Sequence, residues 1–462
     1  MTTLFAPTAL LPDGWADNVL IECDKEGWIV GVDSFKTPHQ NSKDRDAELV
    51  TGPLVPGMPN VHSHSFQRAM AGLTERASGK KDNFWSWRET MYRFVSSIEP
   101  EDVEALAAQV YVEMLKAGYT TVGEFHYLHH QKDGKPYKDR AILSRQIIKA
   151  ALETGIAVTH MPVLYGYGGF GEQAPTEGQK RFINTVPELM KIIEALHKDY
   201  QHTPQVTIGF AHHSLRAVSP EMLREGTRAV RKLLPQAPIH IHAAEQMGEV
   251  EGCLAWSKMR PVEWLLENGN IDERWTFIHC THMTDTETAG LAASGVVAGL
   301  CPTTEANLGD GIFPLIKFFN AGGSFGIGSD SHISISMVEE LRWLEYVQRL
   351  LHRERTLVKQ QENPSVGAVI FEQALSGGAR SLGRKIGKIE IGHRADLLVL
   401  NQDLPFMTGK LRDHILDAAI FASNENPVKD VMVGGRWVIR DRHHKREEHI
   451  LARYRQVIQK FK

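Results

Sequence analysis

From residue 54 onward, short apolar or β-branched runs alternate with longer segments of helical periodicity. Eight such runs occupy residues 54–64, 120–126, 156–164, 206–212, 239–244, 276–280, 296–302 and 324–329. Between them, residues 102–117 and 187–197 show the clearest helical period. Strands that alternate with helices predict βαβ units and a parallel sheet. Eight units predict an α/β protein built on a TIM-type (β/α)8 barrel. An open doubly wound sheet is the alternative, although no Gly-rich phosphate loop follows the first strand.

The two ends of the chain have a different character. Residues 1–52 contain strand-like pieces at 19–23 and 28–32, and residues 387–400 are again strand-like and punctuated by Gly. Residues 431–439 resemble a hairpin around Gly434 and Gly435, and the charged tail, 440–462, has a helical composition. We therefore expect residues 1–53 and 386–462 to form a small β-sandwich domain, with the helical tail, beside a catalytic barrel of residues 54–385.

Composition excludes several classes of protein. The chain has 462 residues, enough for a large barrel with a smaller module, and a net charge of −4, which creates no basic field for nucleic acid or anionic lipid. No apolar run reaches the ~18 residues of a membrane span. The N-terminus carries Asp13 and Asp17 and does not resemble a secretory signal, and the 4 Cys form no CxxC pair. We expect a cytoplasmic protein that binds neither nucleic acid nor membrane.

Histidines stand where the predicted strands end. The first run ends in His62-Ser63-His64, and because alternate strand residues share a face, the two imidazoles can chelate one ion. The fifth run ends in His240-Ile241-His242, followed by Glu245. Carboxyl ends of barrel strands converge on one mouth, so we expect these side chains to meet.

Two further strand ends are polar. The sixth run ends at His279, and the eighth runs into Asp330, although an unpaired carboxylate after an apolar strand is costly to bury. A buried, hydrogen-bonded histidine would explain any one of these signals. The four signals in this order are together highly specific and favour a functional site over a structural role.

This pattern resembles the amidohydrolase superfamily over nearly the whole chain. The third and fourth runs end in 161–165 and 209–213, which hold no Lys or Glu of the kind that bridges two ions in binuclear members. The HxxE after the fifth run is similar to the deaminase branch instead. The resemblance implies one divalent ion held by His62, His64, His242 and Asp330, with Zn²⁺ the best-suited metal and Fe²⁺ also compatible.

The resemblance also implies the chemistry. The ion would lower the pKa of a bound water. Asp330 would accept the water proton, and Glu245 would carry a proton to the nitrogen of the substrate C=N group. His279 would hydrogen-bond the attacking oxygen and stabilise developing charge. Ammonia would then leave.

Two arginines near the mouth bear on the substrate. Arg88 and Arg216 follow different strands, and guanidinium groups suit bidentate capture of carboxylates, so a small anionic substrate fits. Either arginine alone would be explained as a solvated surface charge. At the stretches FWSWRE, GEFHYLHH, HHSLRAV, HIHAAEQ and GIGSDSHIS, the chain resembles the N-formimino-L-glutamate deiminases of bacterial histidine degradation, over about residues 50–340.

That family resemblance implies a hydrolase of linear amidines that converts N-formimino-L-glutamate and water to N-formyl-L-glutamate and ammonia. The implied substrate contacts are Gln67, Arg88, Tyr127, His213 and Arg216. Arg88 with Tyr127, and Arg216 with His213, would hold the two carboxylates, in an order the sequence leaves open. Gln67 would lie near the formimino end. A homodimer is expected from the resemblance as well.

Two alternatives stay open. The same fold and metal could serve a ring deaminase for guanine, cytosine or S-adenosylhomocysteine, or a chlorohydrolase. A catalytically silent metal-binding scaffold is the third hypothesis, although it would not need Glu245, His279 and Asp330.

We expect mainly structural or surface roles for the other conspicuous residues. We expect His129 and His130 to be exposed in a loop, and His443, His444 and His449 to lie in a solvated tail. Residues 301–309 would shape the mouth, where Glu305 or Asn307 could touch the substrate. Trp85 and Trp87 would pack or form a lid.

Overall fold

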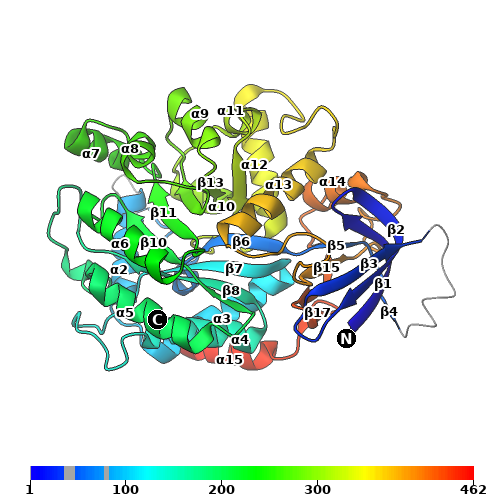
Figure 1. Ribbon diagram of the computed structural model, residues 1–462, viewed down its shortest axis with the longest axis horizontal. Helices are drawn as coiled ribbons and strands as arrows, with labels where there is room; N and C mark the ends of the chain where they lie inside the picture. The colour runs from blue at the N-terminus through cyan, green and yellow to red at the C-terminus, as the bar shows by residue number, and fades with distance from the viewer. Residues whose placement is uncertain (1, 36–46, 78–82, 462) are drawn as a thin grey trace.

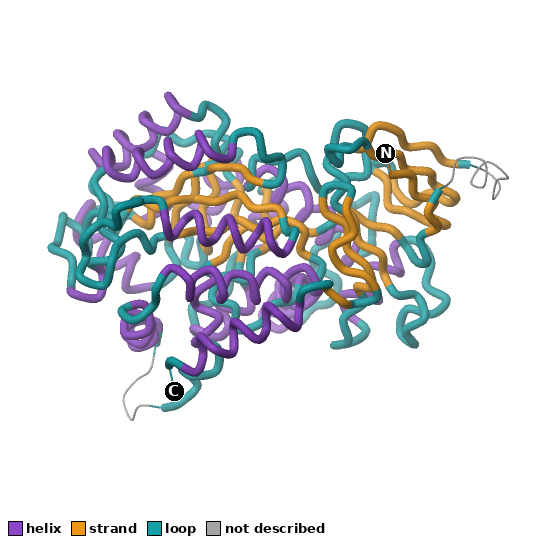
Figure 2. Tube along the Cα trace, turned by 90° about the horizontal axis from the view of Figure 1, so that it is seen from below, coloured by secondary structure: helices purple, strands orange, loops and turns teal. Residues whose placement is uncertain are grey.

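The computed structural model describes residues 2–35, 47–77 and 83–461. Two nine-stranded sheets organise it, a barrel with helices around it and a mixed sheet at one end (Figure 1). Figure 2 shows the helices covering the barrel strands, while the mixed sheet has most of its strands outside this helical layer.

The barrel is closed and parallel, as predicted. Its strands are β6 (Met58–Ser63), β7 (Tyr119–His126), β8 (Ala157–Leu164), β9 (Val206–Ile208), β10 (Phe210–Ser214), β11 (Ile239–Ala243), β12 (Trp275–His279), β13 (Val297–Leu300) and β14 (Ser324–Ile327). β9 and β10 share one position beside β8, and β14 pairs with β6 through Ile327 and Asn60. Strands buried on both faces, such as β7, explain the continuous apolar runs in the sequence.

The first predicted strand, residues 54–64, is two strands in the structure. β5 (Leu54–Pro56) belongs to the mixed sheet, and only β6 enters the barrel. The break falls at Gly57, where an added Cβ would lie 2.2 Å from Thr120 Cγ2. The apolar run hides this break because both strands are buried.

Helices follow the barrel strands in the expected order. They are η1 (Ser65–Met70), α2 (Phe84–Val95), α3 (Pro100–Lys116), α4 (Ile142–Thr154), η2 (Glu177–Gln179), α5 (Val186–Tyr200), α6 (Pro220–Leu233), α7 (Met247–Ser257), α8 (Pro261–Asn268), α9 (Asp285–Ala293), α10 (Pro302–Leu308), α11 (Leu315–Asn320), α12 (Met337–His352) and α13 (Val366–Ser381). Two further helices, α14 (Asp413–Phe421) and α15 (Glu447–Gln459), come later in the chain, after strands of the other sheet. The predicted helices 102–117 and 187–197 correspond to α3 and α5. α13 approaches β14 closely at Gly377, where an added Cβ would lie 1.9 Å from the Phe325 carbonyl oxygen.

The two chain ends build one mixed sheet. Its strands are β1 (Thr2–Leu11), β2 (Gly14–Cys23), β3 (Ile29–Ser34), β4 (Glu48–Leu49), β5, β15 (Leu397–Leu400), β16 (Val428–Val433), β17 (Arg436–Arg440) and β18 (His443–His444). The predicted hairpin is β16–β17, with Gly434 and Gly435 both at positive φ, as a tight two-residue turn requires. The long first strand β1 was not predicted.

The C-terminal helix α15 lies against the barrel helix α3 (Figure 1). Arg453 Nη1 is 3.1 Å from Glu104 Oε1, and the rings of Phe461 and Phe94 are 4.3 Å apart. The chain therefore returns from the mixed sheet to the barrel at its end. The predicted division into domains stays a prediction. Among the described residues, no helix combines the length and the apolar character needed to cross a membrane.

Candidate active site

A cavity of about 50 Å³ lies at the carboxyl ends of the barrel strands. Ten of the eleven residues predicted for the site line it: His64, Gln67, Arg88, Tyr127, His213, Arg216, His242, Glu245, His279 and Asp330. The eleventh, His62, is fully buried and contacts His242 and Asp330. The barrel thus brings all eleven together, as strands that converge on one mouth should.

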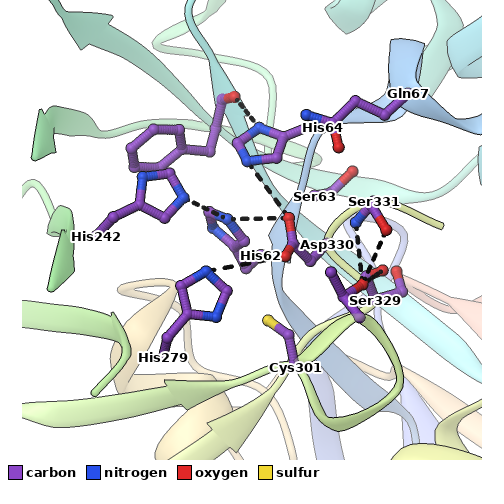
Figure 3. Close-up of polar contacts among 12 residues, drawn as sticks. His62, Ser63, His64, Gln67, His242, His279, Cys301, Ser329, Asp330 and Ser331 are labelled. Atoms are coloured by element: carbon purple, nitrogen blue, oxygen red, sulfur yellow. Dashed lines mark hydrogen bonds and ion pairs between the residues drawn. The ribbon is translucent and has the colours of Figure 1, made fainter. Parts of the chain in front are cut away.

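Three histidines and one aspartate form the buried part of the site. His62 and His64 lie on or directly after β6, His242 lies on β11, and Asp330 follows β14. Asp330 Oδ1 is 3.5 Å from His62 Nε2 and 3.4 Å from His64 Nε2, and the Nε2 atoms of His62 and His242 are 3.0 Å apart. Figure 3 shows the rings and the carboxylate facing one another.

Hydrogen bonds fix which ring nitrogens face inward. Nδ1 of His64 is 2.9 Å from the Phe125 carbonyl oxygen, and Nδ1 of His242 is 2.9 Å from that of His213. Because a carbonyl only accepts, each Nδ1 carries the proton, and each Nε2 presents a lone pair to the centre. Burial lowers the pKa of all three histidines, for His64 to about 3, so the rings are neutral. Neutral imidazoles and a carboxylate that converge in this way fit a divalent cation.

His279 lies at the end of β12 among carboxylates. Its Nε2 is 3.7 Å from Glu245 Oε1 and 3.9 Å from Asp330 Oδ2, and its Nδ1 is 3.2 Å from Glu305 Oε1. Burial lowers the pKa of His279, but Glu245, Glu305 and Asp330 outweigh this and raise it to about 10. Both ring nitrogens therefore face carboxylates, which favours the protonated ring. Glu305 holds this ring in place, a role that the sequence did not reveal.

Arg216 lies between two carboxylates. Its Nη2 is 3.8 Å from Glu245 Oε2 and 3.9 Å from Glu249 Oε2, both longer than a hydrogen bond. Its Nε has no hydrogen-bond partner in the described part of the chain. The guanidinium is thus held by charge attraction rather than by a direct hydrogen bond to either carboxylate. Glu249, which also accepts the backbone N–H of Glu245, was missed in the sequence because it lies in the first turn of α7, where an acidic residue is common.

The backbone is strained where the strands end. Ala244, His279, Cys280, Asp330 and His332 all have positive φ, between 46° and 71°. Non-glycine residues adopt this conformation at a cost and persist in it where the surrounding structure enforces it. Three of the five are, or directly precede, predicted catalytic residues.

Aromatic groups surround the two arginines. Arg88 Cζ, on α2, lies 4.4 Å from the centre of the Trp85 ring, and Arg216 Cζ lies 5.9 Å from it. Gln67 Nε2 donates to Tyr127 Oη at 2.9 Å, and the His213 ring is 5.6 Å from that of Tyr127. The rest of the wall comprises Phe84, Trp87, Met91, Tyr92, Tyr165, Phe182, Leu308 and Ser331. The place of Tyr165 directly after β8 was a signal that could have identified it.

Several predictions about other histidines were wrong. His129 and His130 are buried, and their Nε2 atoms contact the carbonyl oxygens of Val163 and Ile183. His444 is also buried, in β18, with Nε2 at 2.9 Å from the Thr154 carbonyl oxygen. His443 and His449 are exposed, as expected. The buried three sit where a loop or a chain end folds back on the barrel, which local composition does not reveal.

The structure also shows where Asn307, Trp85 and Trp87 lie relative to the cavity. Asn307 lies outside the cavity lining and donates to Glu75 Oε1 at 2.8 Å. Trp87 lines the cavity, whereas Trp85 stacks on Arg88.

Comparison with known proteins agrees with this geometry. The model of the amidohydrolase family matches residues 54–438, and that of the N-terminal domain of formimidoylglutamate deiminase HutF matches residues 1–34. The chain is 48% identical to a formimidoylglutamate deiminase of Pseudomonas aeruginosa, over 99% of both chains. It is 28% identical to a 5-methylthioadenosine/S-adenosylhomocysteine deaminase of Natronomonas pharaonis, over 84% of this chain and 82% of the other.

Among solved structures, an amidohydrolase from Brucella melitensis is similar, with a TM-score of 0.93. It is 43% identical in sequence, and the match covers 100% of this chain and 99% of the other. The similarity therefore includes both sheets and the C-terminal helix.

Proposed function

The chain belongs to the formimidoylglutamate deiminase family of amidohydrolases, and from that premise we propose that it converts N-formimino-L-glutamate and water to N-formyl-L-glutamate and ammonia in the cavity described above. The observation that carries this proposal is that Arg88 and Arg216 line the same cavity as the histidine–aspartate group. A substrate with two carboxylates and one terminal C=N group matches two cations and one hydrolytic centre.

We assign the divalent ion to His62, His64, His242 and Asp330. Three imidazole nitrogens and a carboxylate oxygen suit one Zn²⁺, and Fe²⁺ is compatible with the same donors. Bound there, the ion supplies a water of lowered pKa and hence a nucleophile at neutral pH.

Three side chains then move or hold protons. Asp330 Oδ1 faces the histidines, so its Oδ2 is left to accept the proton of the attacking water. Glu245 gives a proton to the terminal nitrogen of the formimino group as the water oxygen adds to the carbon, and then takes up the remaining proton of that oxygen. The proton held by Asp330 goes to the same nitrogen, and the C–N bond to this nitrogen breaks, so both protons of the water end on nitrogen. His279 donates from Nε2 to the oxygen that adds to the formimino carbon, while Glu305 holds its Nδ1–H. Ammonia leaves, a formyl C=O remains, and the bond from carbon to the glutamate nitrogen survives.

The remaining cavity residues orient the substrate. We propose that Arg88 with Tyr127, and Arg216 with His213, bind the two carboxylates. Gln67, already hydrogen-bonded to Tyr127, lies toward the formimino end. An enclosed site lined by large aromatic rings also keeps bulk water from the reacting carbon.

The test is an ammonia-release screen with the purified full chain. N-formimino-L-glutamate should be turned over far faster than guanine, cytosine or S-adenosylhomocysteine, with N-formimino-L-aspartate as a measure of chain-length tolerance. Faster turnover of a neutral heterocycle would overturn the proposal.

The relatives that deaminate 5-methylthioadenosine or S-adenosylhomocysteine motivate a second candidate, a ring deaminase on the same fold. Arg216→Met separates the two. The substitution should leave turnover of a neutral ring largely intact, but it should strongly lower turnover of a dicarboxylate substrate. The variant Arg140→Met is the matched control, because within the described residues the ion pair of Arg140 is with Glu188 at 3.5 Å, outside the cavity.

We further propose that the enzyme works in the cytoplasm as a homodimer. All four cysteines are buried free thiols, which suits a reducing compartment. The dimer is inferred from family resemblance, and light scattering of the purified protein tests it.

A further inference from the structure

Glu124 is a fully buried carboxylate on β7 that does not line the cavity. Four donors surround it. Oε1 accepts from the backbone N–H of Ser65 at 2.9 Å and from Ser65 Oγ at 2.7 Å. Oε2 accepts from Ser63 Oγ at 2.6 Å and from Tyr111 Oη, on α3, at 3.1 Å. Four hydrogen-bond donors offset the cost of burying this carboxylate, which indicates that it has a specific structural role.

A chain of hydrogen bonds with one direction ends at this carboxylate. Because Ser63 Oγ donates to Glu124, it accepts from His332 Nε2 at 3.0 Å. The other nitrogen of His332, Nδ1, then accepts from Ser329 Oγ at 3.0 Å. Ser329 Oγ in turn accepts from Asn60 Nδ2 at 2.6 Å. Each group in the chain therefore depends on the acceptor that follows it.

The residues that form this series of hydrogen bonds flank the metal-binding group. Ser63 and Ser65 lie on either side of His64, and Ser329 directly precedes Asp330. The backbones of the two segments are joined as well, since the N–H of His64 donates to the Asp330 carbonyl at 3.1 Å. In return, the N–H of Asp330 donates to the His62 carbonyl at 3.0 Å. This series of hydrogen bonds thus holds the end of β6 against the turn after β14.

We propose that Glu124 is a positioning residue that holds the end of β6 against the Asp330 turn, and thereby sets the affinity for the divalent ion without touching it. His332 transmits this restraint between the two segments. The inference rests on the metal site of the proposed function. Partners that orient metal ligands typically contribute about 10- to 100-fold in metal affinity or activity.

Replacing the carboxylate with an amide disturbs the chain at either oxygen. An NH₂ group at the Oε1 position would face the backbone N–H of Ser65, which cannot reverse its direction. At the Oε2 position it would face the hydroxyls of Ser63 and Tyr111. Glu124→Gln keeps the shape of the side chain. It either sets an amide N–H against the Ser65 N–H or forces the Ser63 and Tyr111 hydroxyls to accept instead of donate, which reverses the hydrogen bonds that end at residue 124.

The experiment measures the Zn²⁺ dissociation constant of the full chain by competition with a chromophoric chelator. Glu124→Gln should weaken Zn²⁺ binding by about 10- to 100-fold, and saturating Zn²⁺ should restore most of kcat. The matched control is Glu345→Gln. Glu345 is equally buried and accepts the backbone N–H groups of Leu357 and Val358 at 2.9 and 3.1 Å, but it lies on α12 outside the cavity lining. This control should lower the melting temperature and leave the Zn²⁺ affinity unchanged.

Tyr111→Phe keeps the inference testable if Glu124→Gln does not fold, because it removes only the longest of the four hydrogen bonds. It should weaken Zn²⁺ binding by a smaller factor than Glu124→Gln. Wild-type Zn²⁺ affinity in both variants, or an equal loss in Glu345→Gln, would overturn the inference while leaving the proposed function intact. A wild-type chain that binds no Zn²⁺ and requires no metal would overturn both.

Discussion

The Nε2 atoms of His62 and His242 lie 3.0 Å apart at the centre of the site. Nδ1–H of His242 is committed to a carbonyl oxygen, so its Nε2 offers a lone pair. His62 can satisfy that contact only by donating from Nε2, and its own Nδ1 has no partner in the described part of the chain. A cation between the rings lets both Nε2 atoms act as acceptors, which is the arrangement that metal binding requires.

Removing the metal tests this relationship. Dialysis against a chelator should abolish nearly all ammonia release, and stoichiometric Zn²⁺ should restore it. The metal-free chain should also melt at a lower temperature, because the ion binds only the folded state. Metal content by mass spectrometry and calorimetry check both outcomes. Full activity at a metal content near zero would contradict the assignment.

Glu245→Gln separates proton transfer from metal binding. Glu245 lies 3.7 Å from His279 and is not in the group that holds the ion, so the variant should bind metal normally. Its kcat should fall by about 10²- to 10⁴-fold, the usual contribution of a general acid–base. Steady-state kinetics with parallel metal analysis measures this. Retained kcat would remove Glu245 from the mechanism.

Arg88→Met and Arg216→Met should each lower kcat/KM for N-formimino-L-glutamate by roughly 10- to 100-fold, since each removes charged hydrogen bonds to a carboxylate. Testing N-formimino derivatives of amino acids with one carboxylate shows which arginine serves which end. A substrate that lacks one carboxylate should be insensitive to loss of the matching arginine. Equal sensitivity for every substrate would indicate a structural role instead.

Gly377→Ala tests the packing of α13 against the barrel. The added Cβ would lie 1.9 Å from the Phe325 carbonyl oxygen, so the variant should lose about 1–3 kcal/mol or more of its free energy of unfolding. Gly290→Ala in α9 is the control, because its nearest neighbour, Leu266 Cδ1, is at 3.3 Å and can move. The control should be close to neutral, since alanine favours helix. Denaturant unfolding compares the two, and equal stability would show that α13 can shift.

The barrel could be predicted from the sequence because its strands are short, almost entirely buried and separated by helical segments. The split of residues 54–64 into β5 and β6 could not, since both halves are apolar and the break depends on Thr120 packing against Gly57. The predicted exposure of His129, His130 and His444 was wrong for a related reason. Their burial depends on loops and a chain end that return to the barrel over long distances in sequence.

Within the site, too, some residues could be predicted from the sequence and others could not. His62, His64, His242 and Asp330 were predictable because each stands at the end of a strand, and the topology alone brings strand ends together. The partners behind them were not predictable from sequence. Glu305 reaches His279 from the next strand–helix unit, and Glu249 and Glu124 act through hydrogen bonds whose direction emerges only from three-dimensional contacts.

Identifying both products from N-formimino-L-glutamate tests the central claim most directly. Mass spectrometry and an ammonia assay on the same reaction should give one N-formyl-L-glutamate for each ammonia released. That result requires attack at the formimino carbon with loss of the terminal nitrogen. Release of free glutamate with formamide would place the broken bond on the other side of that carbon and contradict the account.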